Sequence, residues 1–416
     1  MVSGAGAAAV PPEPHPESEP VPEFAGVPSV APRPTAELEP LLAWLRDGRP
    51  AGERLDFTAG TALPDGRLDL CKQGIGARGA ALIADALSEG ASPVRHLLLG
   101  TDGLGDEGAA AVAGGAEVET LYLGCNGITA GGACRIADNL RASPRVLTGV
   151  WLKRNPLGSG GGRAAAELVD VARSLRTLDL VQTGLDAAGA DVLADALLAA
   201  ADNGRRIERL FVGGNPLGAA GAVPLARLVG GGAVDELYVS AARLGDTGAL
   251  CLAGALERAP YGRLTRLSVA SNGIGAEAAA KLVTAATAAG VALLDLGRVR
   301  AAAALGAADN HVDLAAATAI ADTLAGAEHR LAHLVLTHTG MRSREAHRLL
   351  DTAPRATTAT RFVLGSGIAT TVKQRLAALS AHVPAPTVPP DVAAVRSVHR
   401  TATPGTEEGG RSHRGG

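Results

Sequence analysis

The fold is decided by a stretch that reads LYLGCNGITAGGACRIADNL from Leu121 to Leu140. It opens with an alternation of apolar residues at positions 121 and 123, which is typical of a short strand with one buried face. An asparagine follows at position 126, and an apolar residue and small residues then turn the chain. The remainder carries apolar residues at helical spacing. The stretch therefore predicts a strand, a turn and a helix.

The same pattern recurs along most of the chain. Its first apolar residue stands at Leu68, Leu97, Leu121, Val150, Leu178, Leu210, Leu237, Leu267, Leu294, Leu334 and, in a degenerate copy, Phe362. Successive copies begin 24–32 residues apart, except for one step of 40 residues. The turn carries an asparagine at Asn126, Asn155, Asn215, Asn272 and Asn310, where a side-chain amide can bond free backbone groups. Because one unit cannot bury its apolar face alone, about eleven stacked units must supply the core.

The pattern LxLxxNxIGxxGAxxLAxAL, at a step near 28 residues, resembles the ribonuclease-inhibitor-like class of leucine-rich repeats. The resemblance covers roughly Arg67 to Leu379. It implies an α/β leucine-rich-repeat solenoid, a horseshoe with a parallel sheet on the concave face and helices on the convex face. It also implies that the usual activity is protein binding, inhibition or scaffolding, so we expect the chain to bind a protein or peptide partner. A fold by itself does not identify that partner.

The two ends depart from the repeat. Residues 1–34 are rich in proline and glutamate, and we expect them to be disordered. Residues 35–66 should form an N-terminal cap that includes an amphipathic helix from Ala36 to Asp47. The solenoid should then occupy residues 67–381, closed by Arg361 to Leu379. We expect a disordered, mildly basic tail over residues 382–416.

Composition limits the class of protein. The 39 basic residues face 42 acidic ones, so the chain lacks the positive field on which nucleic-acid binders depend. Four cysteines without a CxxC spacing favour a reducing compartment. The residues after Met1 lack a signal-peptide pattern, and no apolar run is long enough to span a bilayer, so we expect a cytoplasmic protein. Only four of the basic residues are lysine, which is typical of a GC-rich bacterial genome, such as an actinobacterial one.

In this class of repeat, the strand residue between the two core apolar residues should point out of the concave face. It is aromatic at Tyr122, Trp151, Phe211 and Tyr238, which are four of only nine aromatic residues in the chain. At the usual strand spacing these four would span about 19 Å. Tyrosine and tryptophan are enriched in binding hot spots. The predicted partner site comprises Tyr122, Trp151, Lys153, Arg154, Asp179, Phe211 and Tyr238. The alternative is that these large side chains only fill space between strands and set the curvature.

Two further interpretations stay open. The insertion at residues 300–309 either extends the binding face, as loops of solenoids often do, or is an alanine-rich surface loop without a role. The chain could also regulate a partner enzyme, as GTPase-activating relatives of this repeat class do, through Arg154, Arg298 or Arg300. A secreted effector with an F-box ranks last, because the helix from Ala36 to Asp47 is too short to be one.

No catalytic, cofactor or metal site is predicted. None of the four lysines follows a glycine, which excludes a P-loop. The glycine clusters recur with the repeat and are turns. His329 and His333 have i,i+4 spacing but lack the glutamate of a zinc protease motif and straddle a helix-to-strand junction. We expect them to be solvated surface histidines.

Overall fold

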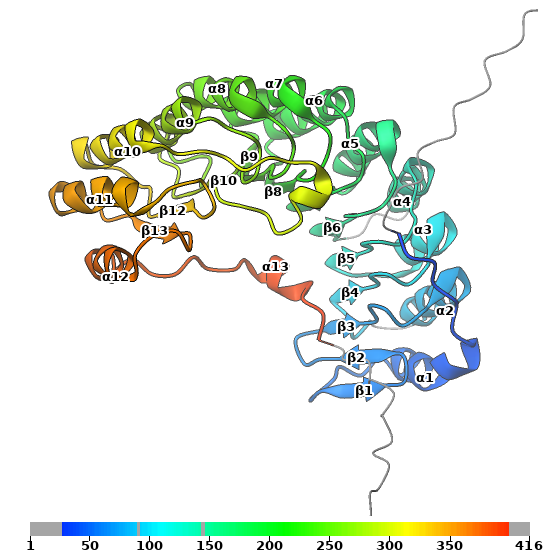
Figure 1. Cartoon of the computed structure of the whole chain (residues 1–416). Helices are drawn as coiled ribbons and strands as arrows, with labels where there is room; N and C mark the ends of the chain where they lie inside the picture. Colours follow the sequence, from blue (N-terminus) through cyan, green and yellow to red (C-terminus); the bar gives the residue numbers. More distant parts are fainter. Residues whose placement is uncertain (1–26, 90–91, 143–145, 399–416) are drawn as a thin grey trace, which may run out of the picture.

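The computed structural model describes residues 27–89, 92–142 and 146–398. Within these residues, thirteen strands form one sheet in chain order, and helices cover its outer side (Figure 1). The pairs β1–β2 and β2–β3 are antiparallel, and every later pair is parallel. The sheet lines the inside of a horseshoe, so the predicted α/β solenoid is confirmed.

Eleven parallel strands carry the repeats. They are β3 (Arg67–Asp69), β4 (His96–Leu98), β5 (Thr120–Tyr122), β6 (Gly149–Trp151), β7 (Thr177–Asp179), β8 (Ile207–Phe211), β9 (Val234–Tyr238), β10 (Arg266–Ser268), β11 (Leu293–Asp295), β12 (His333–Leu336) and β13 (Arg361–Leu364). The helices that follow them are α2 (Gly76–Ser88), α3 (Gly105–Gly115), α4 (Ala130–Ala142), α5 (Gly161–Val171), α6 (Ala187–Asp202), α7 (Gly218–Gly230), α8 (Gly245–Leu256), α9 (Ala276–Ala288), α10 (Leu314–Gly326), α11 (Ser343–Thr352) and α12 (Thr370–Leu379). Short 3-10 helices lie at η2 (Gly158–Gly160), η3 (Ala303–Leu305) and η4 (Ala353–Arg355).

A ladder of buried asparagines holds the turns of neighbouring repeats together. The side-chain oxygen of Asn155 accepts hydrogen bonds from the backbone amides of Asn126, at 2.9 Å, and Ile128, at 3.1 Å. Its amide nitrogen donates to the carbonyl oxygens of Leu123 and Leu152, at 2.9 and 2.8 Å. The ladder satisfies backbone groups that the strand-to-turn transition leaves unpaired, as the recurring asparagine predicted.

The N-terminal end of the core is covered by its own small structure. It consists of η1 (Thr35–Leu38), α1 (Glu39–Asp47), β1 (Leu55–Phe57) and β2 (Gly60–Ala62). The expected amphipathic helix is therefore present, but the antiparallel pair was not predicted. Residues 27–34 also take a defined course, because the Arg33 amide donates to the carbonyl of Gly74 at 2.6 Å. This corrects the expected disorder for residues 27–34, while residues 1–26 lie outside the described residues.

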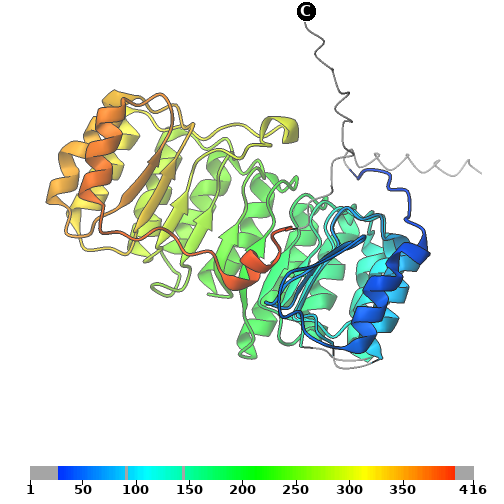
Figure 2. The ribbon, with the colours of Figure 1, turned by 90° about the horizontal axis from the view of Figure 1, so that it is seen from below.

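The C-terminal end departs most from expectation. After α12 the chain leaves the last repeat and crosses the open side of the horseshoe towards β3 (Figures 1 and 2). The crossing segment includes a short helix, α13 (Pro390–Ala394). We call residues 383–398 the strap. Its defined course corrects the disordered tail expected from residue 382, since hydrogen bonds to the sheet hold it; residues 399–416 lie outside the described residues.

Candidate functional site on the concave face

The predicted concave residues lie in one row across the sheet, which we call the central row. Strand register places Tyr122 beside Trp151, Trp151 beside Asp179, Asp179 beside Phe211, and Phe211 beside Tyr238. The row continues to Asp69 on one side and to Val363 on the other. Successive side chains of a strand point to opposite faces of the sheet, and the register places the concave-facing residues of neighbouring strands side by side.

The centre of the row is more buried than expected. The Trp151 and Phe211 ring centroids are 5.4 Å apart, and the Phe211 and Tyr238 rings stack at 4.3 Å with 9° between their planes. Trp151 is only 4% exposed and Asp179 only 3% exposed. The expectation that both point freely into solvent is therefore wrong, because the large rings close over the strand between them. Tyr122, Phe211 and Tyr238 remain half-buried.

Asp179 is a carboxyl group in an apolar enclosure. Its Oδ1 accepts a hydrogen bond from the Val181 amide at 2.8 Å. Burial raises the pKa of Asp179 to about 6, although the Val181 amide and the charge of Lys153 lower it in part. A cation that reached this carboxylate would stabilise its ionised form.

Lys153, Tyr122 and Arg154 form the loop-side edge of the row. The Lys153 ammonium lies 5.1 Å from the centroid of the Tyr122 ring, within range of a cation–π interaction. The Tyr122 ring fits there because Gly100 and Gly124 beneath it carry no Cβ; a Cβ on Gly100 would lie 2.5 Å from the ring. Arg154 is exposed and has a left-handed backbone, with φ of 58°. Both predicted basic residues thus border the aromatic row.

The indole N–H of Trp151 is an unused donor. Its nitrogen is buried and has no hydrogen-bond partner among the described residues. A buried donor without an acceptor costs on the order of 1–3 kcal/mol. A partner cannot reach this nitrogen unless the side chains that cover it move.

A second row of concave side chains runs parallel to the central row, two residues earlier on each strand. Register places in it Arg67, His96, Thr120, Gly149, Thr177, Arg209, Glu236, Arg266, Leu293, His333 and Arg361. This row was not predicted, because only the residue between the two core apolar positions was expected to point out of the concave face. The signal was present, since an arginine directly precedes the first core residue at Leu68, Leu210, Leu267 and Phe362.

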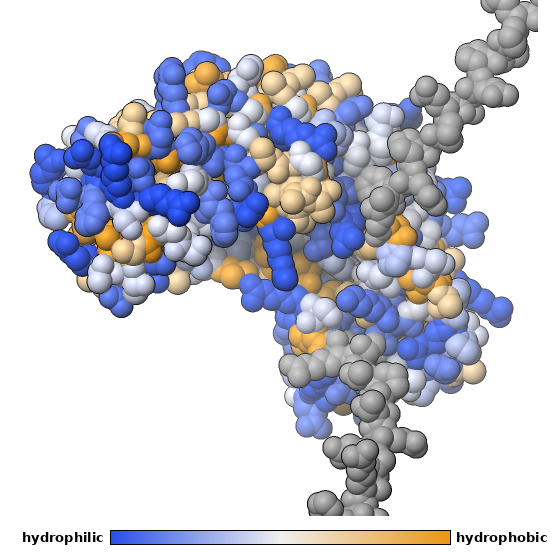
Figure 3. All heavy atoms as spheres, viewed as in Figure 1, coloured by the Kyte–Doolittle hydropathy of each residue, from blue (hydrophilic) through white to orange (hydrophobic). Residues whose placement is uncertain are grey.

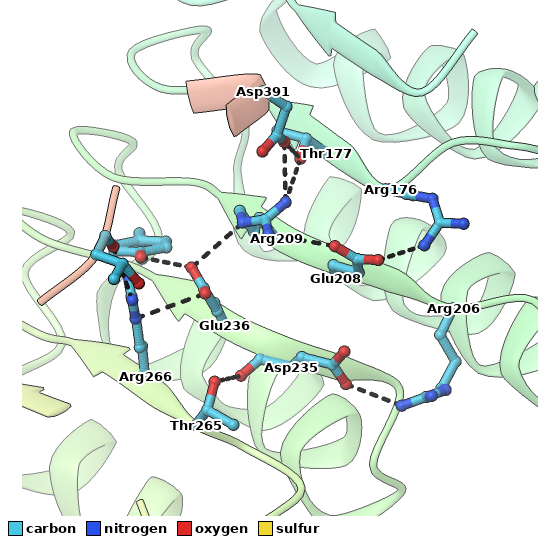
Figure 4. A network of polar contacts seen from close by, with 12 residues as sticks. Arg176, Thr177, Arg206, Glu208, Arg209, Asp235, Glu236, Thr265, Arg266 and Asp391 are labelled. Atoms are coloured by element: carbon cyan, nitrogen blue, oxygen red, sulfur yellow. Dashed lines mark hydrogen bonds and ion pairs between the residues drawn. The ribbon is translucent and has the colours of Figure 1, made fainter. Parts of the chain in front are cut away.

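The second row contains a network of alternating charges (Figure 4). Arg209 lies 3.2 Å from Glu208 and 3.6 Å from Glu236, and Arg266 approaches the other oxygen of Glu236 at 3.6 Å. The Tyr238 hydroxyl donates to Glu236 at 2.7 Å, which links the network to the central row. These contacts fix the two guanidinium groups in position.

The strap bonds to this second row. Arg209 donates to the Asp391 carboxylate at 2.9 Å, and the Thr177 hydroxyl donates to the same oxygen. Arg266 donates to the Thr387 carbonyl at 2.9 Å. The concave face is therefore already occupied, in part, by the chain's own C-terminal segment.

Comparison with known families agrees with this architecture. The sequence model of the Leucine Rich repeat family matches residues 264–283, which include β10 and the first part of α9. The fold is a leucine-rich-repeat solenoid. Such domains generally mediate protein–protein interaction and are typically non-catalytic. No curated protein matches the chain closely enough to serve as a relative.

In this leucine-rich-repeat solenoid, the insertion at residues 300–309 folds back over earlier repeats. Arg243 donates to the Leu305 carbonyl in η3 at 2.8 Å, and Arg298 pairs with Asp309 at 3.0 Å across the base of the insertion. A groove of about 410 Å³ lies between η3 and the turns after β7, β8 and β9, and Gln182, Pro216 and Arg243 contribute to its lining. Figure 3 shows hydrophilic residues around the hollowed inner side of the solenoid, near this loop.

The two candidate histidines, His329 and His333, lie inside the protein rather than on its surface. His329 and His333 are both buried, so the expectation of solvated side chains is wrong. The His329 ring accepts from the Leu331 amide and contacts the Leu324 carbonyl, and burial lowers the pKa of both histidines. Within the part of the chain that the structure describes, no cluster of three or more His, Cys, Asp or Glu residues could hold a metal ion. The helices in the same part of the chain are all too short or too polar to span a bilayer.

Proposed function

We propose that the concave face binds a protein or peptide partner without catalysing a reaction. The observation that carries the proposal is the concentration of four aromatic side chains on strands β5, β6, β8 and β9, in one register row. Aromatic residues in such a row supply rigid contact area, and most binding free energy comes from a few such residues. The site comprises Tyr122, Trp151, Lys153, Arg154, Asp179, Phe211 and Tyr238.

The chemistry of the row defines what the partner must offer. The half-buried rings of Tyr122, Phe211 and Tyr238 offer contact area to a partner, whereas Asp179 and the Trp151 indole are buried within the row. Lys153 and Arg154 at the edge favour acidic groups on the partner's periphery. The face is thus suited to a segment that offers both surfaces for ring contacts and an acidic group.

Other features of the chain support finer assignments. The step near 28 residues and the helix in each repeat favour a ribonuclease-inhibitor-like subtype. Cys71, Cys134 and Cys251 are free thiols, and burial raises the pKa of the Cys71 thiol, which disfavours its thiolate form. Free thiols at these three positions are consistent with a reducing, cytoplasmic location, and the scarcity of lysine among the basic residues favours a bacterial source.

The test compares capture of binding partners by two matched variants. Tyr122→Ser combined with Tyr238→Ser alters the concave row and spares the Trp151–Phe211 pair. Tyr261→Ser removes the 64% exposed aromatic residue that precedes β10 and serves as the control. Circular dichroism first establishes that both variants fold. We expect the native partner to be lost from the concave variant alone; equal recovery by both variants would contradict the site.

A second candidate function is regulation of a partner enzyme through loop residues. Arg154 and Arg300 are exposed at the turns past the strands, and Arg298 is held by Asp309. An arginine on a fixed turn can stabilise charge in the active site of a bound enzyme. Under this alternative, Arg154→Ala and Arg300→Ala change the turnover of the captured enzyme but not its capture.

A further inference from the structure

We infer that the concave face is a site for a proline-rich segment that carries an acidic residue, and that the strap occupies it in cis. The strap and the partner would then compete for one surface. This inference rests on the proposed function, since it names the kind of segment that the concave face binds.

Four arginines of the second row hold the strap, and all four stand at the same strand position. Arg361 donates to the Val383 carbonyl at 3.3 Å, and Arg266 donates to the Thr387 carbonyl at 2.9 Å. Arg209 donates to the Asp391 carboxylate at 2.9 Å, and Arg67 donates to the Arg396 carbonyl at 3.0 Å. The strap therefore passes from β13 to β3, against the order of the repeats. Its acceptors therefore meet several donors of one register row rather than a single accidental contact.

The composition of the strap suits this mode of binding. Residues 383–398 read VPAPTVPPDVAAVRSV and include four prolines. Proline has no N–H and favours an extended backbone whose carbonyls have no internal partners. Such a segment loses little entropy when it binds, and its carbonyls can accept from arginine side chains. The arginine row supplies those donors.

Two carboxylates fix the register of the strap. Asp391 of the strap accepts from both Arg209 and Thr177, and the side chains of Asp391 and Arg209 are only 18% and 14% exposed. At the other end, Asp69 of β3 accepts from the Ser397 hydroxyl at 2.8 Å and from the Val398 amide at 2.5 Å. A largely desolvated charge pair discriminates strongly against segments that lack the charge. Asp391 is therefore the residue that a competing segment must reproduce.

The strap is held weakly enough to be displaced. Of its residues, only Val383 and Ala394 are buried, and Val388 is 46% exposed. It thus contributes little apolar area to the core, in contrast to the repeats. Its stability on the face comes from polar anchors and from its covalent attachment, which gives an effective concentration on the order of millimolar. A partner segment that also contacted the half-buried rings of Tyr122 and Tyr238 would replace it.

The test uses the full chain and a fluorescent synthetic peptide of residues 383–398. In the wild-type protein the attached strap excludes the peptide. Asp391→Lys places a lysine against Arg209, which should release the strap. We expect the peptide to bind this variant at least tenfold more tightly than the wild type. Asp351→Lys, an identical charge change at an exposed position of α11, is the control and should behave as the wild type.

Two further measurements make the outcome decisive. Tryptic cleavage after Arg396 reports strap release, and a peptide with Asp391→Asn should bind the opened variant at least tenfold more weakly than the unaltered peptide. Unchanged cleavage in Asp391→Lys, or a released strap with no peptide binding, would overturn the inference.

Capture of the native partner separates the two proposals. If Asp391→Lys and wild type recover the partner equally, the concave site stands and the competition fails.

Discussion

The rings of Trp151 and Phe211 lie 5.4 Å apart, although a complete strand runs between the strands that carry them. Backbones two strands apart are separated by about 10 Å. The two side chains therefore lean towards each other over β7, whose concave residue is Asp179. This arrangement accounts for the burial of a carboxyl group on what the sequence indicates is an open face. It also explains why burial raises the pKa of Asp179 to about 6.

Asp179→Asn should stabilise the protein at neutral pH and change little at acidic pH. The pKa of Asp179 is raised in the folded state, so its stability contribution is fully present below about pH 4. It is lost as pH rises through about 6, because the unfolded chain ionises more readily. We expect the free energy of unfolding of Asp179→Asn to exceed that of wild type by about 2 kcal/mol above pH 7. Urea denaturation between pH 4 and 8 measures this, and a constant difference across that range would contradict it.

Asp102→Asn should also stabilise the protein, because residue 102 is the acidic member of the asparagine ladder. Its Oδ1 accepts from the amides of Gln73 and Gly74, at 2.7 and 3.0 Å, while its buried Oδ2 has no hydrogen-bond partner among the described residues. Burial raises the pKa of Asp102 to about 7. An asparagine would keep the acceptor and donate to carbonyls, as Asn126 donates to Leu123 at 3.0 Å.

We expect Asp102→Asn to raise the free energy of unfolding by about 2 kcal/mol at pH 8 and by less at pH 5. The reverse change, Asn126→Asp, should lower it and increase its dependence on pH. Thermal denaturation at both pH values distinguishes the two variants. A lower melting temperature for Asp102→Asn at pH 8 would show that the asparagine cannot adopt the ladder geometry.

The repeat itself could be predicted from the sequence, because each structural element depends on residues close together in the chain. The apolar alternation at Leu121 and Leu123 and the asparagine at position 126 determine a strand and a turn without reference to distant residues. The central row followed from the same local rule. The approach of the Trp151 and Phe211 rings over β7 could not be predicted in this way. The direction in which each ring leans depends on which residue lies on the strand between them.

The strap could not be predicted for a related reason. A proline-rich segment has no hydrophobic periodicity, so its composition indicates only the absence of regular structure. Its position depends on Arg209, 182 residues earlier, and on Asp69, more than 300 residues earlier. Neither pairing can be inferred from a single sequence. The four arginines that precede core strand residues are visible in the sequence, however, and indicate a row of donors on the sheet.

Asn155→Ala should be strongly destabilising, although it removes no apolar contact. The side chain joins two repeats through four hydrogen bonds, and its loss leaves buried amides and carbonyls without partners. We expect the free energy of unfolding to fall by about 3 kcal/mol. Asn203→Ala is the matched control, because the Asn203 amide makes one exposed bond, to the Ala199 carbonyl, and should cost well under 1 kcal/mol. Similar losses for both variants would show that the ladder is not the source of stability.

The residue before the ladder position adopts a left-handed backbone in most repeats. Substitutions at this position can therefore test stability and partner binding separately. Gly214 has φ of 69° there, whereas Thr101 has 63° and Arg154 has 58°. Glycine adopts such angles at little cost, while a side chain is strained by about 1 kcal/mol. Thr101→Gly, outside the proposed site, should therefore raise the free energy of unfolding by up to 1 kcal/mol and leave partner capture unchanged.

Arg154→Gly should raise stability to a similar extent but weaken partner capture, because Arg154 borders the aromatic row. Backbone strain that persists at an exposed arginine is expected where the side chain has a role. Melting temperatures and partner recovery, measured for both glycine variants, test this directly. If Arg154→Gly captures the partner as well as Thr101→Gly does, Arg154 has no part in the site, and the strain at this turn is only a consequence of the repeat geometry.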